Sequence, residues 1–118
     1  MNTSPSLNDL FEIEKESQLK TLLNELNELR SNGFNPESLL KMFRAAHSLK
    51  GAARLVKNNN TETIAHTLEE HLRIIQEKGA VSEELEKLLV SAIDQLGGYA
   101  QFAEMQSMQL PLTEKTSH

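Results

Sequence analysis

Apolar residues recur every three or four positions along four stretches of this 118-residue chain, and short polar breaks separate the stretches. This spacing puts the apolar side chains on one face of a helix, and the first such stripe begins at Leu7 and Leu10. Three Pro and five Gly are too few for a turn-rich β fold. The predicted fold class is therefore all-α, an antiparallel up-down four-helix bundle.

Capping residues indicate where the predicted helices begin. Ser6 begins the first helix, Asn35 the second and Ser82 the fourth, because each side chain can accept a hydrogen bond from the first helical turn. We expect the second helix to run to about Lys57. We expect one of the asparagines at 59–60 to cap the third helix.

The fourth stripe weakens at a pair of glycines, and Tyr99, Phe102 and Met105 can continue it as a bent or separate fifth helix. We expect residues 1–106 to form one bundle domain. Residues 107–118 are then a flexible tail or the start of a linker. The chain has no Cys, so its core forms without disulfides.

Composition argues against several kinds of partner. The net charge is -5, and four Phe, one Tyr and no Trp offer few surfaces for base stacking, so no nucleic-acid partner is expected. No apolar run approaches the length of a membrane span, and the N-terminus lacks the basic and then apolar order of a signal peptide. We therefore expect a cytoplasmic protein with no membrane partner.

The second predicted helix has an unusual outer face. At about 100° per residue, its core-facing stripe lies opposite His47 and consists of Met42, Ala45, Leu49, Ala52 and Val56. The face around His47 instead carries Leu40, Phe43, Arg44, Lys50, Gly51 and Arg54. Residues 36–57 hold five cations and one acid, a net of +4, so the rest of the chain carries -9. This concentration weakens the interpretation as an ordinary solvated basic face, and the pattern alone leaves that interpretation and a functional, exposed His47 equally open.

A two-part motif stands out on the second and third helices. His47, Lys50 and Gly51 form the pattern His-x-x-Lys-Gly, and His66 and Glu69 follow His47 by 19 and 22 residues. This combination resembles the histidine phosphotransfer (HPt) domain family, and within it the N-terminal phosphoacceptor domain of CheA-type chemotaxis kinases. The resemblance covers about residues 7–96. It departs from the family pattern at position 57, where the family often has Gly, and at position 71, where an apolar residue is common.

The resemblance implies a role for each motif residue. His47 accepts a phosphoryl group and passes it to the Asp of a response-regulator receiver domain. Glu69 holds the Nδ1–H of His47 and leaves Nε2 as the acceptor. Lys50 neutralises the incoming phosphoryl oxygens, and His66 tunes Glu69. Gly51 leaves room for the phosphoryl group and for the partner's active-site loop.

The expected partners follow from what the sequence lacks. It has no glycine-rich phosphate-binding loop, so ATP and Mg²⁺ would be supplied by partner domains: a histidine kinase ATP-binding domain and a receiver domain. Leu40 and Phe43 would give apolar docking contacts, and Arg44 and Arg54 would steer toward an acidic receiver pocket. We expect a monomeric domain of a CheA-like kinase.

Alternative interpretations concern both the function and individual residues. A free-standing phosphorelay shuttle and a non-phosphorylated helical adaptor are the rival functions. Glu69 and Glu70 can also be surface acids that pair with Arg73. No metal site is expected, because His66 and His71 lie about 140° apart around a helix. His71 is predicted to be a packing residue at the core boundary.

Overall fold

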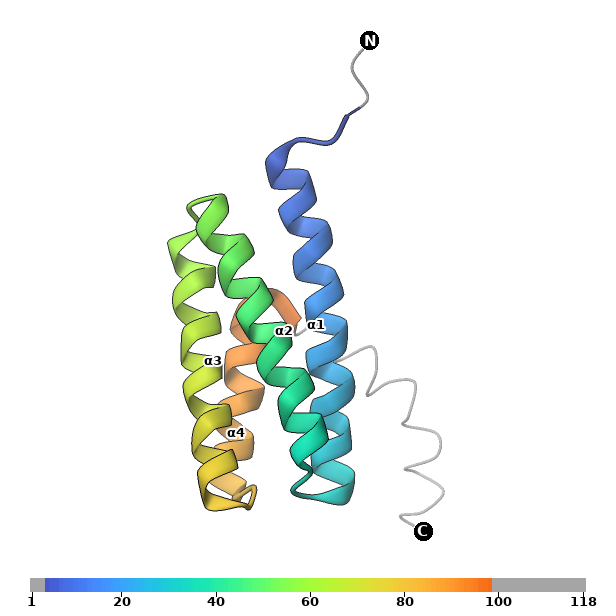
Figure 1. The fold of residues 1–118 in the computed structure, drawn as a ribbon, viewed down its shortest axis with the longest axis vertical. Helices are drawn as coiled ribbons and strands as arrows, with labels where there is room; N and C mark the ends of the chain where they lie inside the picture. Colours follow the sequence, from blue (N-terminus) through green and yellow to red (C-terminus); the bar gives the residue numbers. More distant parts are fainter. Residues whose placement is uncertain (1–3, 99–118) are drawn as a thin grey trace.

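The structure is a computed structural model that describes residues 4–98. Its elements are α1 (Leu7–Asn32), α2 (Pro36–Leu55), α3 (Asn59–Lys78), α4 (Glu83–Ile93) and the short π-helical turn η1 (Asp94–Gly98). The four helices run alternately up and down and pack side by side, which confirms the all-α bundle (Figure 1). The predicted fifth helix and the tail at 107–118 lie outside the described residues. Within residues 4–98, no helix combines the length and the apolar character needed to cross a membrane.

The predicted caps at three helix starts are confirmed. The Ser6 hydroxyl accepts a hydrogen bond from the backbone N–H of Asp9 at 3.1 Å, and the Asp9 carboxylate accepts one from the N–H of Ser6. The Asn35 side chain caps α2, and the Ser82 hydroxyl caps α4 by accepting from the N–H of Leu85 at 3.1 Å. These contacts satisfy backbone donors that lack a partner inside the helix.

The boundary between α2 and α3 differs from the prediction. Lys57 adopts a positive φ of 60°, so α2 ends at Leu55 rather than at Lys57. Asn58, not an asparagine at 59–60, caps α3, because its side chain accepts from the N–H of Thr61 at 3.0 Å. The left-handed conformation of Lys57 turns the chain, so α3 is capped one residue earlier than the sequence predicted.

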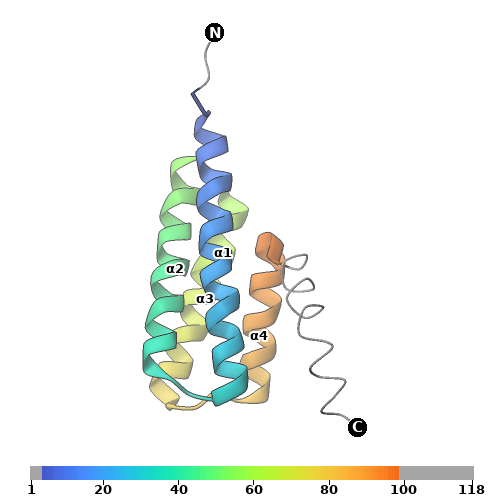
Figure 2. The same ribbon diagram turned by 90° about the vertical axis from the view of Figure 1, so that its right-hand side faces the viewer.

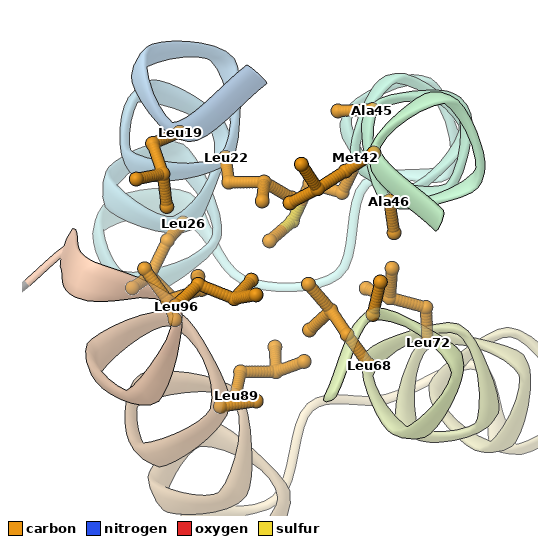
Figure 3. Close-up of a cluster of buried hydrophobic side chains, with 14 of the residues drawn as sticks. Leu19, Leu22, Leu26, Met42, Ala45, Ala46, Leu68, Leu72, Leu89 and Leu96 are labelled. Atoms are coloured by element: carbon orange, nitrogen blue, oxygen red, sulfur yellow. The ribbon is translucent and has the colours of Figure 1, made fainter. Parts of the chain in front are cut away.

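The hydrophobic core lies between all four helices, as Figure 3 shows. Its largest fully buried side chains are Leu22, Leu26, Met42, Leu49, Leu68, Leu72, Ile75, Leu89 and Ile93. Leu7 and Leu10, predicted to lie on the first core stripe, are instead 58% and 49% exposed. The N-terminal part of α1 extends past the end of α4 and η1, so it has less to pack against (Figure 2).

Helix α2 is rotated relative to the predicted orientation. It packs against both α1 and α3. Ala46 and Ala53 are therefore buried, whereas Ala52 and Val56, predicted as core, are only half-buried. The centre of the buried face of α2 therefore lies about 40° closer to α3 than the helical wheel predicted. This rotation brings the Lys50 side of α2 against α3, where the candidate site lies.

Candidate functional site

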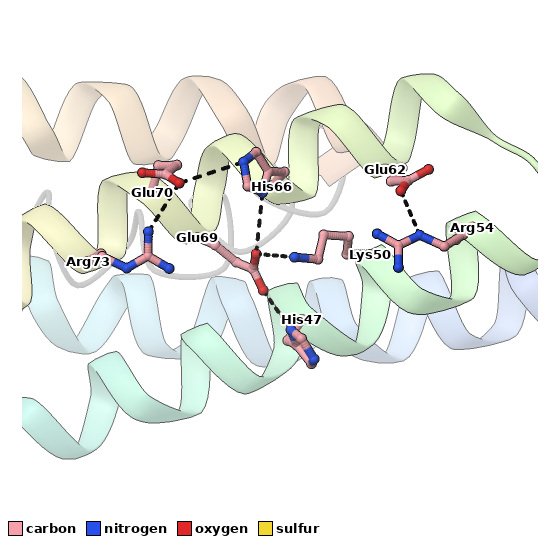
Figure 4. Close-up of polar contacts among 8 residues, drawn as sticks. All are labelled: His47, Lys50, Arg54, Glu62, His66, Glu69, Glu70 and Arg73. Carbon is pink, nitrogen blue, oxygen red and sulfur yellow. Dashed lines mark hydrogen bonds and ion pairs between the residues drawn. The ribbon is translucent and has the colours of Figure 1, made fainter.

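His47 lies near the middle of α2 with 68% of its side chain exposed, as predicted. Its Nδ1 is 2.9 Å from Oε2 of Glu69 on α3 (Figure 4). An ionised carboxylate can only accept hydrogen bonds, so this contact requires the imidazole proton on Nδ1. In the neutral form of this exposed ring, the lone pair then lies on the other nitrogen, Nε2.

Glu69 is the buried centre of this arrangement. Its side chain is 3% exposed, and Oε1 accepts a hydrogen bond from Nζ of Lys50 at 2.6 Å. Burial raises the pKa of Glu69, but the hydrogen bonds and charges of Lys50 and His47 outweigh burial and bring the pKa below its usual 4.5. The carboxylate therefore stays ionised near neutral pH and can orient His47. Lys50 is held beside His47 with only 17% of its side chain exposed.

The lowered pKa of Glu69 predicts a pH dependence of stability. A carboxyl group whose pKa falls on folding stabilises the fold above its unfolded-state pKa, and this contribution disappears as the pH falls through the folded-state value. The free energy of unfolding of wild type relative to Glu69→Gln should therefore be constant above about pH 5 and decline toward pH 3. Urea titrations at pH 7, 5 and 3.5 measure it. A difference independent of pH would show that folding leaves the pKa of Glu69 unchanged.

His66 completes the predicted group on α3. Its Nδ1 lies 3.7 Å from Oε1 of Glu69, and its Nε2 lies 3.6 Å from a carboxylate oxygen of Glu70. Glu70 is in turn hydrogen-bonded to Arg73 at 3.1 Å. The alternative interpretation, in which Glu69 and Glu70 both pair with Arg73, is therefore correct for Glu70 only. Glu69 instead turns toward α2.

The remaining outer-face residues of α2 differ in their surroundings. Gly51 is exposed, and a Cβ there would have nothing within 4 Å, so the fold itself does not demand glycine. Arg44 is exposed. Arg54 is 66% exposed and binds Glu62 of α3 at 2.8 Å, so part of its charge is balanced within the domain. For Gly51, the space left by the missing side chain can therefore matter only to a molecule that approaches this face from outside the domain.

An apolar groove lies between α2 and α3, beginning one turn from His47. It is lined by Pro36, Leu39, Leu40, Phe43, Leu72, Arg73 and Gln76. Leu40 is 48% exposed as predicted, but Phe43 is half-buried and packs against the core, because α2 is turned toward α3. The sequence interpretation missed the α3 wall of this groove. Leu72 and Gln76 are one turn apart on α3 and share a face of that helix. This face becomes a wall of the groove only because α2 packs beside it, and the pattern of α3 alone does not indicate that packing.

His71 is half-buried between α3 and α4, in agreement with a packing role. Its Nδ1 is buried without a hydrogen-bond partner in the described part of the chain. It lies apart from the group formed by His47, Lys50, His66 and Glu69.

Comparison with known proteins identifies the family. The Hpt domain family model matches residues 7–108, and the chain belongs to this family of phosphotransfer modules. Its fold is similar to a solved structure, the phosphorylated P1 domain of CheA3 from R. sphaeroides in complex with CheY6. That likeness has a TM-score of 0.67 at 23% sequence identity and covers 85% of this chain and 77% of the other. No curated protein matches the sequence.

Proposed function

We propose that His47 is the phosphoacceptor of this Hpt domain and that Nε2 is the atom that carries the phosphoryl group. One observation carries the proposal: an exposed imidazole has its Nδ1 held by a buried, ionised carboxylate. Hydrogen bonding to Nδ1–H raises the basicity of the ring and fixes its tautomer. The nucleophilic lone pair of the neutral ring therefore lies on Nε2, the nitrogen that Glu69 does not hold.

The chemistry is two displacements at one phosphorus atom. The Nε2 lone pair of His47 attacks the γ-phosphorus of ATP, an N–P bond forms, and the P–O bond breaks with its electron pair leaving on ADP. A carboxylate oxygen of a receiver-domain Asp then attacks the same phosphorus, and the N–P electron pair returns to Nε2. The Nδ1 proton stays against Glu69 throughout. Lys50 binds the same carboxylate as His47, and in this proposal its ammonium group balances charge at the phosphoryl oxygens.

The partners follow from this chemistry. ATP and Mg²⁺ enter with a kinase ATP-binding domain, and the acceptor Asp enters with a response-regulator receiver domain, the kind of partner seen with the CheA3 P1 domain. We place the chain as the phosphoacceptor domain of a CheA-like kinase. The apolar groove offers contact area beside His47, and Arg44 and Arg54 add positive charge that steers acidic partners.

Transfer from ATP by a CheA-type kinase core tests the proposal. Wild type should take up radiolabel from γ-labelled ATP, and His47→Gln should take up none. The product should be labile in acid and stable in alkali, as expected for a phosphoramidate. Equal labelling of both proteins would place the site elsewhere. If neither protein is labelled by the kinase or by a receiver charged with acetyl phosphate, the adaptor function replaces this one.

Docking is tested by truncating the exposed rim of the groove. Leu40→Ala should weaken receiver binding by about three- to tenfold, because it removes apolar contact, while changing the free energy of unfolding by less than about 0.5 kcal/mol. Phe43→Ala should lower both the affinity for the receiver and the free energy of unfolding, since Phe43 also packs on the core. Titration calorimetry and urea unfolding separate the two effects. Wild-type affinity in Leu40→Ala would move the docking surface off this groove.

A further inference from the structure

His66 lies between two carboxylates of its own helix, as Figure 4 shows. Its Nδ1 faces Glu69 at 3.7 Å and its Nε2 faces Glu70 at 3.6 Å. The His66 side chain is 58% exposed, so packing alone does not fix its ring. Glu70 lies on the far side of that ring, and an imidazolium, which has an N–H on each nitrogen, pairs with both carboxylates.

Glu70 is itself held in place. Arg73 donates a hydrogen bond to Oε2 of Glu70 at 3.1 Å, and the same oxygen faces His66. The Arg73 guanidinium also lies over the Phe43 ring, 6.0 Å from its centre, at the edge of the groove. Glu70 therefore has a hydrogen-bonded partner, Arg73, in addition to its contact with His66.

The two carboxylate oxygens of Glu69 contact different residues. Oε2 faces His47, while Oε1 is shared by Lys50 and His66. Lys50 donates the hydrogen bond to Oε1, and the protonated His66 ring adds an ion pair to the same oxygen. Together they favour the carboxylate rotation that aims Oε2 at Nδ1 of His47. A displaced His66 would leave this orientation to Lys50 alone.

We propose that Glu70 is a positioning residue: it holds His66 against Oε1 of Glu69 and thereby supports the alignment of His47 for phosphorylation. This inference rests on the proposed function and extends it to a residue outside the His-x-x-Lys-Gly motif and its His66–Glu69 partners. Arg73 supports the same contact through Glu70. Contacts between exposed groups are individually modest, so the expected effect on rate is about two- to fivefold.

A double-mutant cycle tests the coupling between Glu70 and His66. Glu70→Gln should slow labelling of His47 by about two- to fivefold. In a His66→Gln background, the same substitution should have no further effect, because the ring it positions is gone. Equal slowing in both backgrounds would show that Glu70 acts by its charge alone and would overturn the proposal. Glu77→Gln is the matched control, since it removes an exposed acid from the same helix.

A second readout uses the unphosphorylated chain. The ring ¹H–¹³C resonances of His66 should move in Glu70→Gln and stay unchanged in Glu77→Gln. Unmoved signals would contradict the positioning contact. A labelled wild type with an equally fast Glu70→Gln would overturn this inference and leave the proposed function intact. If the wild type takes no label from the kinase core or from a phosphorylated receiver, the proposed function and this inference are both overturned.

Discussion

Replacing Glu69 by Gln should slow the phosphorylation of His47 by roughly 10- to 100-fold, the range by which activity falls when a partner that orients a metal-bound imidazole is changed. The amide keeps the size of the side chain but cannot offer two anionic oxygens. It can accept from either His47 or Lys50, and its NH₂ group then faces the other donor. The ring loses its fixed tautomer, and Lys50 loses its counter-charge.

The measurement is the initial rate of label transfer from a CheA-type kinase core at saturating ATP. Circular dichroism of the variant verifies that the helices persist, and Glu77→Gln serves as the control for loss of one acid from α3. A rate within twofold of wild type in a folded Glu69→Gln protein would remove Glu69 from the mechanism. His47 would then react without an orienting group.

Replacing Leu68 by Ala should lower the free energy of unfolding by about 2–5 kcal/mol. Leu68 is fully buried where α3 meets the core, so truncation leaves a cavity that its neighbours fill only in part. In a bundle of this size, the melting temperature should fall on the order of 10–30 °C. Leu55→Ala is the control, because Leu55 is 74% exposed and should change stability by less than about 0.5 kcal/mol. Equal stability of the two variants would place Leu68 outside the core.

Local sequence patterns were sufficient to predict the helices, whereas the resemblance to the Hpt family predicted the central contact of the site. Ser6, Asn35 and Ser82 cap helices because each acts on backbone donors within three residues of itself. The pairing of His47 with Glu69 spans 22 residues, and the family resemblance implied it because the family's motif includes residues on two neighbouring helices.

Features that depend on the neighbouring helix were not predictable in the same way. The rotation of α2 that half-buries Phe43 depends on how α1 and α3 share its faces. A helical wheel has no information about such packing. The α3 wall of the groove has the same origin. The contact of Glu70 with His66 depends on side-chain rotamers, which spacing alone leaves open.

The position of the phosphoryl group on the imidazole ring tests the central claim most directly. A ¹⁵N-labelled chain, phosphorylated by a kinase core, can be examined by ¹⁵N and ³¹P NMR for the nitrogen coupled to phosphorus. The geometry of Glu69 on Nδ1 predicts coupling to Nε2 of His47, with Nδ1 still protonated. Phosphorus on Nδ1 of His47, or on the ring of His66 or His71, would contradict this account.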